Sequence, residues 1–163
     1  MRIHPDVALL VRLIDEAFDA RAWHGTPLRG SVRGISASQA AWRPAADRHN
    51  IWEVIVHCAY WKYAVRRRLT GEKRGSFAVK GSNWFVRPLS PASATDVEWR
   101  ADLALLIEEH KKLRATVGRL VPASLRRQQP GSKYTALALV QGIAAHDLYH
   151  AGQIQLLKRL ART

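Results

Sequence analysis

The sequence has few of the features that mark secreted, membrane-spanning or disordered proteins. It has a single cysteine in 163 residues, Cys58, so no internal disulfide can form and a cytoplasmic location is expected. No apolar run approaches the roughly 20 residues that a membrane-spanning helix needs. The opening stretch, MRIHPDVALLVRLIDEAF, carries acidic residues and lacks a small-residue cleavage pattern, so we expect the first helix of a mature protein rather than a signal peptide. Hydrophobic residues make up 47% of the chain, which is too many for a disordered protein.

Acidic residues are also scarce. The chain has 13 Asp and Glu against 26 Lys and Arg, a formal net charge of +13. Such a surplus favours an anionic partner, which could be nucleic acid, a membrane surface or an acidic small molecule. The alternative is that genome composition, rather than any partner, accounts for the charge. The sequence contains no glycine-rich phosphate loop and no nucleophile elbow.

Four segments have the periodicity of amphipathic helices: residues 5–22, 51–69, 96–120 and 134–160. Residues that favour helix starts stand at the beginning of each segment: Pro5, Asn50 with Glu53 three residues later, Thr95 with Glu98, and Ser132 or Thr135. Gly71 follows the second segment and is expected to end it.

Two connections between these segments are long. Residues 23–49 include ISASQAAW, a candidate helical turn, and residues 71–94 lack the period-two alternation of a strand. In the second connection, Asn83, Trp84 and Arg87 could either reach over a pocket or fasten the loop to the helices. Four long helices around one core predict an all-α fold, a four-helix bundle with two long connections, in which residues 1–163 form a single domain.

Two glycines, Gly142 and Gly152, lie inside the fourth predicted helix. Glycine inside a helix costs about 1 kcal/mol relative to alanine. Close approach of another helix, within the bundle or across a dimer, would explain both residues.

Three histidines lie on helix faces that are expected to face the core. His146 and His150 are four residues apart in HDLYHAGQI. On one helix, such side chains lie about 40° apart around the axis and about 6 Å apart along it, so both imidazoles can reach one metal ion. His57, in IWEVIVHCAYW, shares a stripe with Val54 and Trp61 and supplies a third ligand if its helix packs against theirs.

A divalent metal would satisfy all three inward rings at once. A buried polar ring without a partner costs a few kcal/mol. Three protein ligands with one open position are typical of catalytic rather than structural metal sites. The alternative is three separate core histidines, each hydrogen-bonded to a carbonyl or a side chain, and the residues alone leave both explanations open.

Four other residues near these faces have plainer explanations. His110 lies on an inward seam and is expected to be a hydrogen-bonded core residue rather than a fourth ligand or a donor to a ligand. Asp147 should point roughly 100° away from His146, toward solvent or in support of a ligand. Glu53 is expected to cap its helix rather than act as a general base, and Cys58 to be a small buried hydrophobe.

The order and spacing of several motifs resemble the DinB/YfiT-like superfamily over most of the chain. These motifs are AWHGTPLRGSVRGISASQAAWRP after the first helix, HNIWEVIVHCAYWKYAVRRRLTGE, SNWF, DVEWRADLALLIEEHKKL and HDLYHAGQIQLLKRL. The resemblance implies an up-up-down-down bundle with a long crossover, and usually a homodimer. It also implies that His57, His146 and His150 bind a divalent metal such as nickel, zinc or iron, with water completing the shell.

Characterised members of that family include transferases and isomerases that use low-molecular-weight thiols such as bacillithiol, mycothiol or glutathione. We therefore expect a metal-dependent enzyme, either a thiol S-transferase or a hydrolase, that acts on a small molecule, and an anionic one would suit the basic surface. No catalytic acid or base and no thiol-binding residue stands out.

Two alternatives belong to other functional classes: a nucleic-acid or polyanion-binding protein, and a non-catalytic stress-response scaffold. The first is motivated by the net charge and by cations clustered near the end of the second helix: Arg66, Arg67, Arg68, Lys73, Arg74 and Lys80. The second alternative is a protein that keeps the fold but catalyses no reaction.

Overall fold

The computed structural model describes residues 4–129 and 131–162, and within them the regular structure is helical apart from one isolated bridge between Gln128 and Thr135. The long helices are α1 (Pro5–Phe18), α4 (Ile51–Thr70), α5 (Asp96–Val117) and α6 (Ala136–Leu160). The connections contain α2 (Leu28–Ser31), α3 (Ala37–Ala41) and the 3₁₀ turns η1 (Pro91–Ser93) and η2 (Pro122–Ser124). The predicted all-α four-helix bundle is confirmed, and α3 is the helical turn expected in ISASQAAW. None of the helices in the described ranges is long and apolar enough to cross a membrane.

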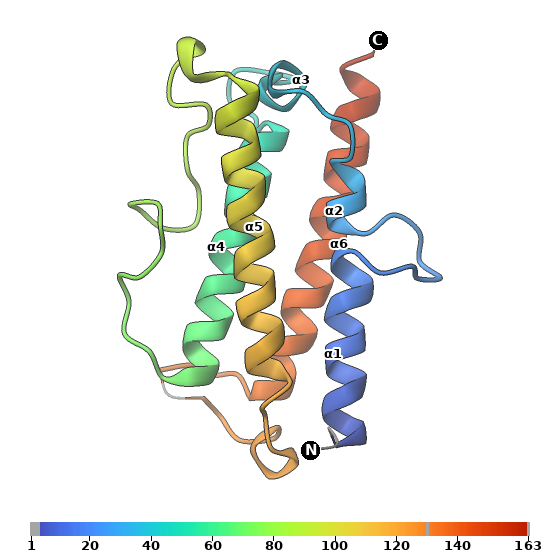
Figure 1. Cartoon of the computed structure of the whole chain (residues 1–163), viewed down its shortest axis with the longest axis vertical. Helices are drawn as coiled ribbons and strands as arrows, with labels where there is room; N and C mark the ends of the chain where they lie inside the picture. The colour runs from blue at the N-terminus through green and yellow to red at the C-terminus, as the bar shows by residue number, and fades with distance from the viewer. Residues whose placement is uncertain (1–3, 130, 163) are drawn as a thin grey trace.

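The helix directions differ from those that the resemblance implied. Figure 1 shows α1 running up from the N-terminus, α4 and α5 both running down, and α6 running up to the C-terminus. The expected up-up-down-down order is therefore wrong, and the observed order is up-down-down-up. The long crossover is confirmed, because α4 and α5 are parallel neighbours and residues 71–94 return along the bundle to connect them.

Capping residues set most helix ends. Asn50 and Glu53 form a reciprocal capping box at the start of α4, and Gly71, with φ of 75°, ends that helix in the left-handed conformation. The side chains of Thr95 and Thr135 accept hydrogen bonds from backbone N–H groups in the first turns of α5 and α6. As a result α4 and α6 begin and end within two residues of the predicted positions.

Two helices are shorter than predicted. The first ends at Phe18, because Asp19 leaves the helical conformation and forms an ion pair of 2.5 Å with Arg29 as the chain turns back. This turn brings Leu28 into the core. Helix α5, the third predicted helix, ends at Val117. After it, the N–H groups of residues 119 and 120 donate to carbonyls three residues back. The last predicted turn of that helix is thus tightened into a 3₁₀ form.

The core consists of two apolar clusters, one toward each end of the bundle. Trp52 and Leu106 belong to one cluster, and Ile14 and Leu113 belong to the other. Helix α4 contributes to both clusters, so most of its residues are buried. Its buried length is what allows side chains near its centre to meet those of α6.

A buried ion pair joins α4 to α6. Lys62 Nζ contacts Oδ2 of Asp147, and both side chains are 1% exposed. The ammonium also lies 4.8 Å from the centroid of the Phe18 ring. Burial raises the pKa of Asp147, and the attraction of Lys62 acts in the opposite direction. The expectation that Asp147 could face solvent is wrong, because Lys62 provides a charge partner inside the core.

The two glycines of α6 are not explained by helix packing within the bundle. No atom outside the local helix lies within 4 Å of a Cβ built on Gly142 or Gly152. That part of the prediction is wrong, and close approach across a dimer stays a prediction.

The buried ion pair yields a test of stability. Replacing Lys62 with Met leaves the Asp147 carboxylate buried without a partner, which should lower the free energy of unfolding by about 3–5 kcal/mol in urea denaturation. The double variant Lys62→Met/Asp147→Leu should recover most of this loss. Arg12→Met, which removes an exposed partner of Glu16, serves as the control and should change stability little. Equal stability of Lys62→Met and the parent protein would contradict this account of the pair.

Candidate metal centre

Three histidines from two helices meet near the middle of the bundle. His57 comes from α4, and His146 and His150 come from consecutive turns of α6. The Nε2 atom of His146 lies 3.1 Å from that of His57 and 3.2 Å from that of His150. His57 and His150 are buried, while His146 is partly exposed. The predicted convergence of the three rings is therefore confirmed.

The outer nitrogens of two rings are held by neighbouring oxygens. Nδ1 of His57 donates to the backbone carbonyl of Asn83 at 2.7 Å, and Nδ1 of His150 donates to Oε1 of Gln153 at 2.7 Å. A neutral imidazole has one N–H, so the Nε2 atoms of both rings carry lone pairs that face His146. Outer hydrogen bonds of this kind orient histidines in metal sites.

The separation of the inner nitrogens fits a divalent ion. Bonds of about 2.0–2.1 Å to a tetrahedral ion place two ligand nitrogens roughly 3.3 Å apart. The observed separations of 3.1 and 3.2 Å are close to that value. Without an ion, two inward lone pairs compete for the one proton that Nε2 of His146 can carry. The buried histidines could bind a divalent metal, and imidazole suits nickel, zinc and iron alike.

Burial keeps these imidazoles neutral. It lowers the pKa of His57 to about 4, against the hydrogen bond to the Asn83 carbonyl, and lowers the pKa of His146 to about 3. Burial also lowers the pKa of His150, against the hydrogen bond to Gln153. Neutral imidazole is the form that binds metals, so near pH 7 no proton has to leave the site before an ion enters.

The long crossover covers the histidines with two consecutive residues, Asn83 and Trp84. Asn83 has φ of 65°, in the left-handed region that asparagine tolerates better than most residues. Its carbonyl accepts from His57, and its side-chain oxygen accepts a hydrogen bond of 3.0 Å from the Trp61 indole. Trp84 stacks on the ring of His57, with 3.9 Å between the centroids. The crossover is thus both fastened to α4 and placed over the histidines.

Two other candidates, Arg87 and Glu53, hold the surrounding structure together. Nε of Arg87 binds Oδ2 of Asp102 on α5 at 2.6 Å, which fastens the crossover. Besides capping α4, Glu53 accepts hydrogen bonds from Arg43 at 2.5 Å and from His49 at 3.0 Å. Burial opposes the charge of Glu53, but the bonds from Arg43 and His49 outweigh it and lower the pKa of that carboxyl. The predicted role of Glu53 as a cap is confirmed.

Cys58 and Asp147 lie behind the histidines. The Cys58 sulfur, a carboxylate oxygen of Asp147 and a ring nitrogen of His146 lie within 4.8 Å of one another. Burial raises the pKa of Cys58, so the thiol stays protonated, and its predicted place as a small buried residue is confirmed. Nδ1 of His146 and Oδ1 of Asp147 have no hydrogen-bond partner among the described residues.

His110 lies apart from the other three histidines. Its ring stacks on Phe18 at 3.7 Å, and its Nε2 is 3.6 Å from Oδ1 of Asp15, which is too far for a hydrogen bond. Its Nδ1 has no partner in the described part of the chain, and burial lowers its pKa to about 3. The predicted place of His110 in the core is confirmed, but the expected hydrogen bond is not.

Three contributors to this region were not identified from the sequence: the hydrogen bond from His150 to Gln153, the pairing of Lys62 with Asp147, and the Asn83 carbonyl. Gln153 lies three residues after His150, and this spacing places both side chains on one helix face, so a signal was present. Lys62 and Asp147 are opposite charges inside apolar stretches of two helices that were expected to pack, which is also a usable signal. The carbonyl of Asn83 gave no signal in the sequence, because every residue has a backbone carbonyl.

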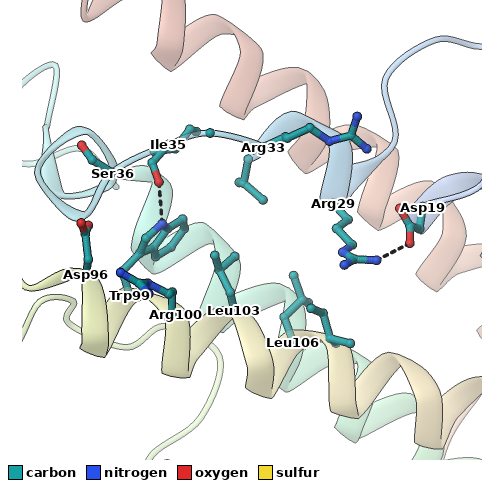
Figure 2. Close-up of a pocket in the computed structure, with 13 residues that line it drawn as sticks. Asp19, Arg29, Arg33, Ile35, Ser36, Asp96, Trp99, Arg100, Leu103 and Leu106 are labelled. Carbon is teal, nitrogen blue, oxygen red and sulfur yellow. Dashed lines mark hydrogen bonds and ion pairs between the residues drawn. The ribbon is translucent and has the colours of Figure 1, made fainter.

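A cavity larger than the one beside the histidines lies elsewhere in the bundle. Figure 2 shows this cavity, of about 580 Å³, between α5 and the segment around α2 and α3. Two pairs lie in its wall: Arg29 binds Asp19 at 2.5 Å, and the Trp99 indole donates to the carbonyl of Ile35 at 2.9 Å. None of the three convergent histidines lines it. The chemistry of the site therefore belongs to the region between α4 and α6.

Comparisons with known proteins agree with this architecture. The sequence model described as the DinB superfamily matches residues 20–154, a range that includes all three histidines. Searches among curated proteins and among solved structures returned no match.

The lowered histidine pKa values predict how the stability of the metal-free protein depends on pH. Unfolded imidazoles have a pKa of about 6.5, so between about pH 6.5 and about pH 5 the unfolded chain binds more protons than the folded one. Stability should then fall as the pH falls, by roughly 1 kcal/mol per pH unit for each neutral buried histidine. Urea denaturation at a series of pH values measures this slope. The double variant His57→Gln/His146→Gln should have a shallower slope, and an unchanged slope would contradict the assignment.

Proposed function

The chain belongs to the DinB superfamily, and we propose that it is a metal-dependent enzyme in which His57, His146 and His150 hold one divalent ion. The observation that supports this most is the convergence of three Nε2 atoms at separations of 3.1 and 3.2 Å, with two outer nitrogens fixed by oxygens. Nickel, zinc and iron are the candidate ions. Three protein ligands leave a position open for a thiol or a water.

The reaction class that we propose is S-transfer from a low-molecular-weight thiol, or hydrolysis. A bound divalent ion supplies Lewis acidity, which lowers the pKa of a coordinated thiol or water. The residues of the chain provide the setting. Asn83 and Gln153 fix the orientation of two rings, and Trp84 covers one of them, so water reaches the site chiefly past the partly exposed His146.

We also propose that the protein is a cytoplasmic, single-domain homodimer. Support for the dimer comes from the outer face of α6, where Tyr149 and Leu156 are exposed and Gly152 lies between them with open space at its Cβ position. Exposed apolar side chains at helical spacing, with a small residue between them, suit contact with a second helix.

The polyanion-binding alternative has weaker support from the surface. Two of the clustered cations are occupied, because Arg66 binds Glu72 at 2.6 Å and Arg67 donates to the backbone carbonyl of Glu72 at 3.3 Å. Nucleic-acid binding stays a prediction of the net charge, and a DNA titration over a range of salt concentrations tests it.

Elemental analysis tests the metal site directly. Protein purified without a metal-affinity tag should contain about one divalent ion per chain. His57→Ala and His146→Ala should each lose most of that ion, because two remaining imidazoles do not close the site. His24→Ala, at an exposed histidine outside the cluster, should keep it. A parent protein that contains no ion and takes up none from nickel, zinc or iron salts would overturn the proposal.

Absorption spectroscopy tests whether a thiol enters the open position. Protein loaded with cobalt or nickel should gain a thiolate-to-metal charge-transfer band when bacillithiol, mycothiol or glutathione is added. The corresponding alcohol or disulfide should give no band. If no thiol gives the band, the hydrolase is favoured. Metal binding without turnover on thiol or ester substrates would favour the non-catalytic scaffold.

A further inference from the structure

A cavity of about 320 Å³ lies between α4 and α6 beside the convergent histidines. His146 lines it, and Trp61, Val65, Leu139 and Ile143 supply apolar walls. Its volume is within the range of small-molecule sites. Because His146 is the partly exposed member of the histidine cluster, a molecule in this cavity lies next to the side from which the cluster is reached.

The cavity has a cationic rim. Among the described residues that line it, Arg68 is the one with a formal charge. No carboxylate in the described part of the chain pairs with its guanidinium, which lies 5.7 Å from the centroid of the Trp61 ring. Tyr134 also lines the cavity, and Nζ of Lys133 lies 5.4 Å from the centroid of its ring. An unpaired guanidinium at the edge of apolar walls suits a carboxylate.

The charge and one of the histidines both lie near one indole. The ring of His146 is 6.1 Å from that of Trp61, and the guanidinium of Arg68 approaches the same ring. A molecule that extends along Trp61 therefore has one end near Arg68 and the other near His146. These ends differ in chemistry, because one offers a cation and the other offers the proposed metal site.

Gly142 lines the same cavity, and its lack of a side chain keeps the space open. A Cβ at this position would meet nothing within 4 Å, so helix packing does not require glycine here. Glycine inside a helix is nevertheless unfavourable relative to alanine. A bound molecule that uses this space accounts for the glycine, which helix packing within the bundle does not.

We propose that this cavity binds a small amphiphilic anion. Its apolar body lies against Trp61, Ile143 and Gly142, its carboxylate binds Arg68, and its other end lies beside His146. The inference rests on the proposed function in one respect, since it makes this anion the thiol or the substrate that meets the ion. Binding of the apolar body and the carboxylate requires no metal, so it can be measured separately.

The test compares an acid with its neutral amide. We expect metal-free protein to bind 4-phenylbutyrate roughly tenfold more tightly than 4-phenylbutanamide in an NMR titration, because only the acid can form a charged pair with Arg68. Arg68→Met should abolish this preference and leave the affinity for the amide unchanged. Arg159→Met, at an exposed position near the end of α6, removes the same charge elsewhere and should keep the preference.

A second pair of variants tests the apolar part of the cavity. Gly142→Leu should weaken binding of both probes at least tenfold, because the new side chain fills the space that they use. Ala145→Leu, at an exposed position of α6 that does not line the cavity, should bind both like the parent protein. Equal affinity for acid and amide, or normal binding by Gly142→Leu, would overturn the proposal.

Metal content measured on the same variants separates this proposal from the metal site. Gly142→Leu and Arg68→Met should keep the metal content of the parent protein, since neither residue belongs to the histidine cluster. Loss of probe binding with normal metal content in these variants supports the cavity. If the protein binds the acid selectively but takes up no metal, the proposed anion site in the cavity is supported and only the metal-dependent enzymatic function is overturned.

Discussion

Burial of three imidazole rings between α4 and α6 is the constraint on which the rest of the structure depends. Each ring brings two nitrogens out of water, and a buried nitrogen without a partner costs free energy. The carbonyl of Asn83 and the amide of Gln153 satisfy two of them, and by doing so they turn two inner lone pairs toward His146. A shared cation satisfies all the inner nitrogens together, whereas a proton on one ring satisfies only part of the set.

This constraint is useful only if α4 and α6 keep a fixed register. The buried contact between Lys62 and Asp147 lies about one and a half turns from His57 on α4 and within one turn of His146 and His150 on α6. A sliding motion that separated the rings would therefore also separate two charges inside the core. The crossover acts from the other side, through Asn83 and Trp84. Charge pairing behind the rings and a covering loop in front of them hold the same geometry.

The sequence predicted the parts of the fold that depend on local interactions. Asn50, Glu53 and Thr135 act on the backbone within one turn, so the ends of α4 and α6 could be placed closely. The end of α1 could not be placed, because it depends on the ion pair of Asp19 with Arg29, ten positions later, and on burial of Leu28 at the start of α2.

The same distinction applies to the candidate site. Helical spacing predicted that His146 and His150 lie together, and an inward stripe on another helix predicted His57. The carbonyl that orients His57 belongs to a loop in an irregular conformation, which no periodic pattern describes. The helix directions were also beyond local reasoning, because they depend on where residues 71–94 lead the chain.

The parallel course of α4 and α5 has an evolutionary consequence. Two parallel helices require a connecting segment about as long as the helices themselves. Here that segment contributes Asn83 and Trp84 to the histidine cluster and Phe85 to one of the two apolar clusters, while the other cluster contains none of its residues. Changes in this segment that keep Phe85 buried can therefore alter which molecules reach the histidines while the helical framework folds as before. Such an architecture lets descendants of one ancestor diversify their chemistry through changes in the crossover.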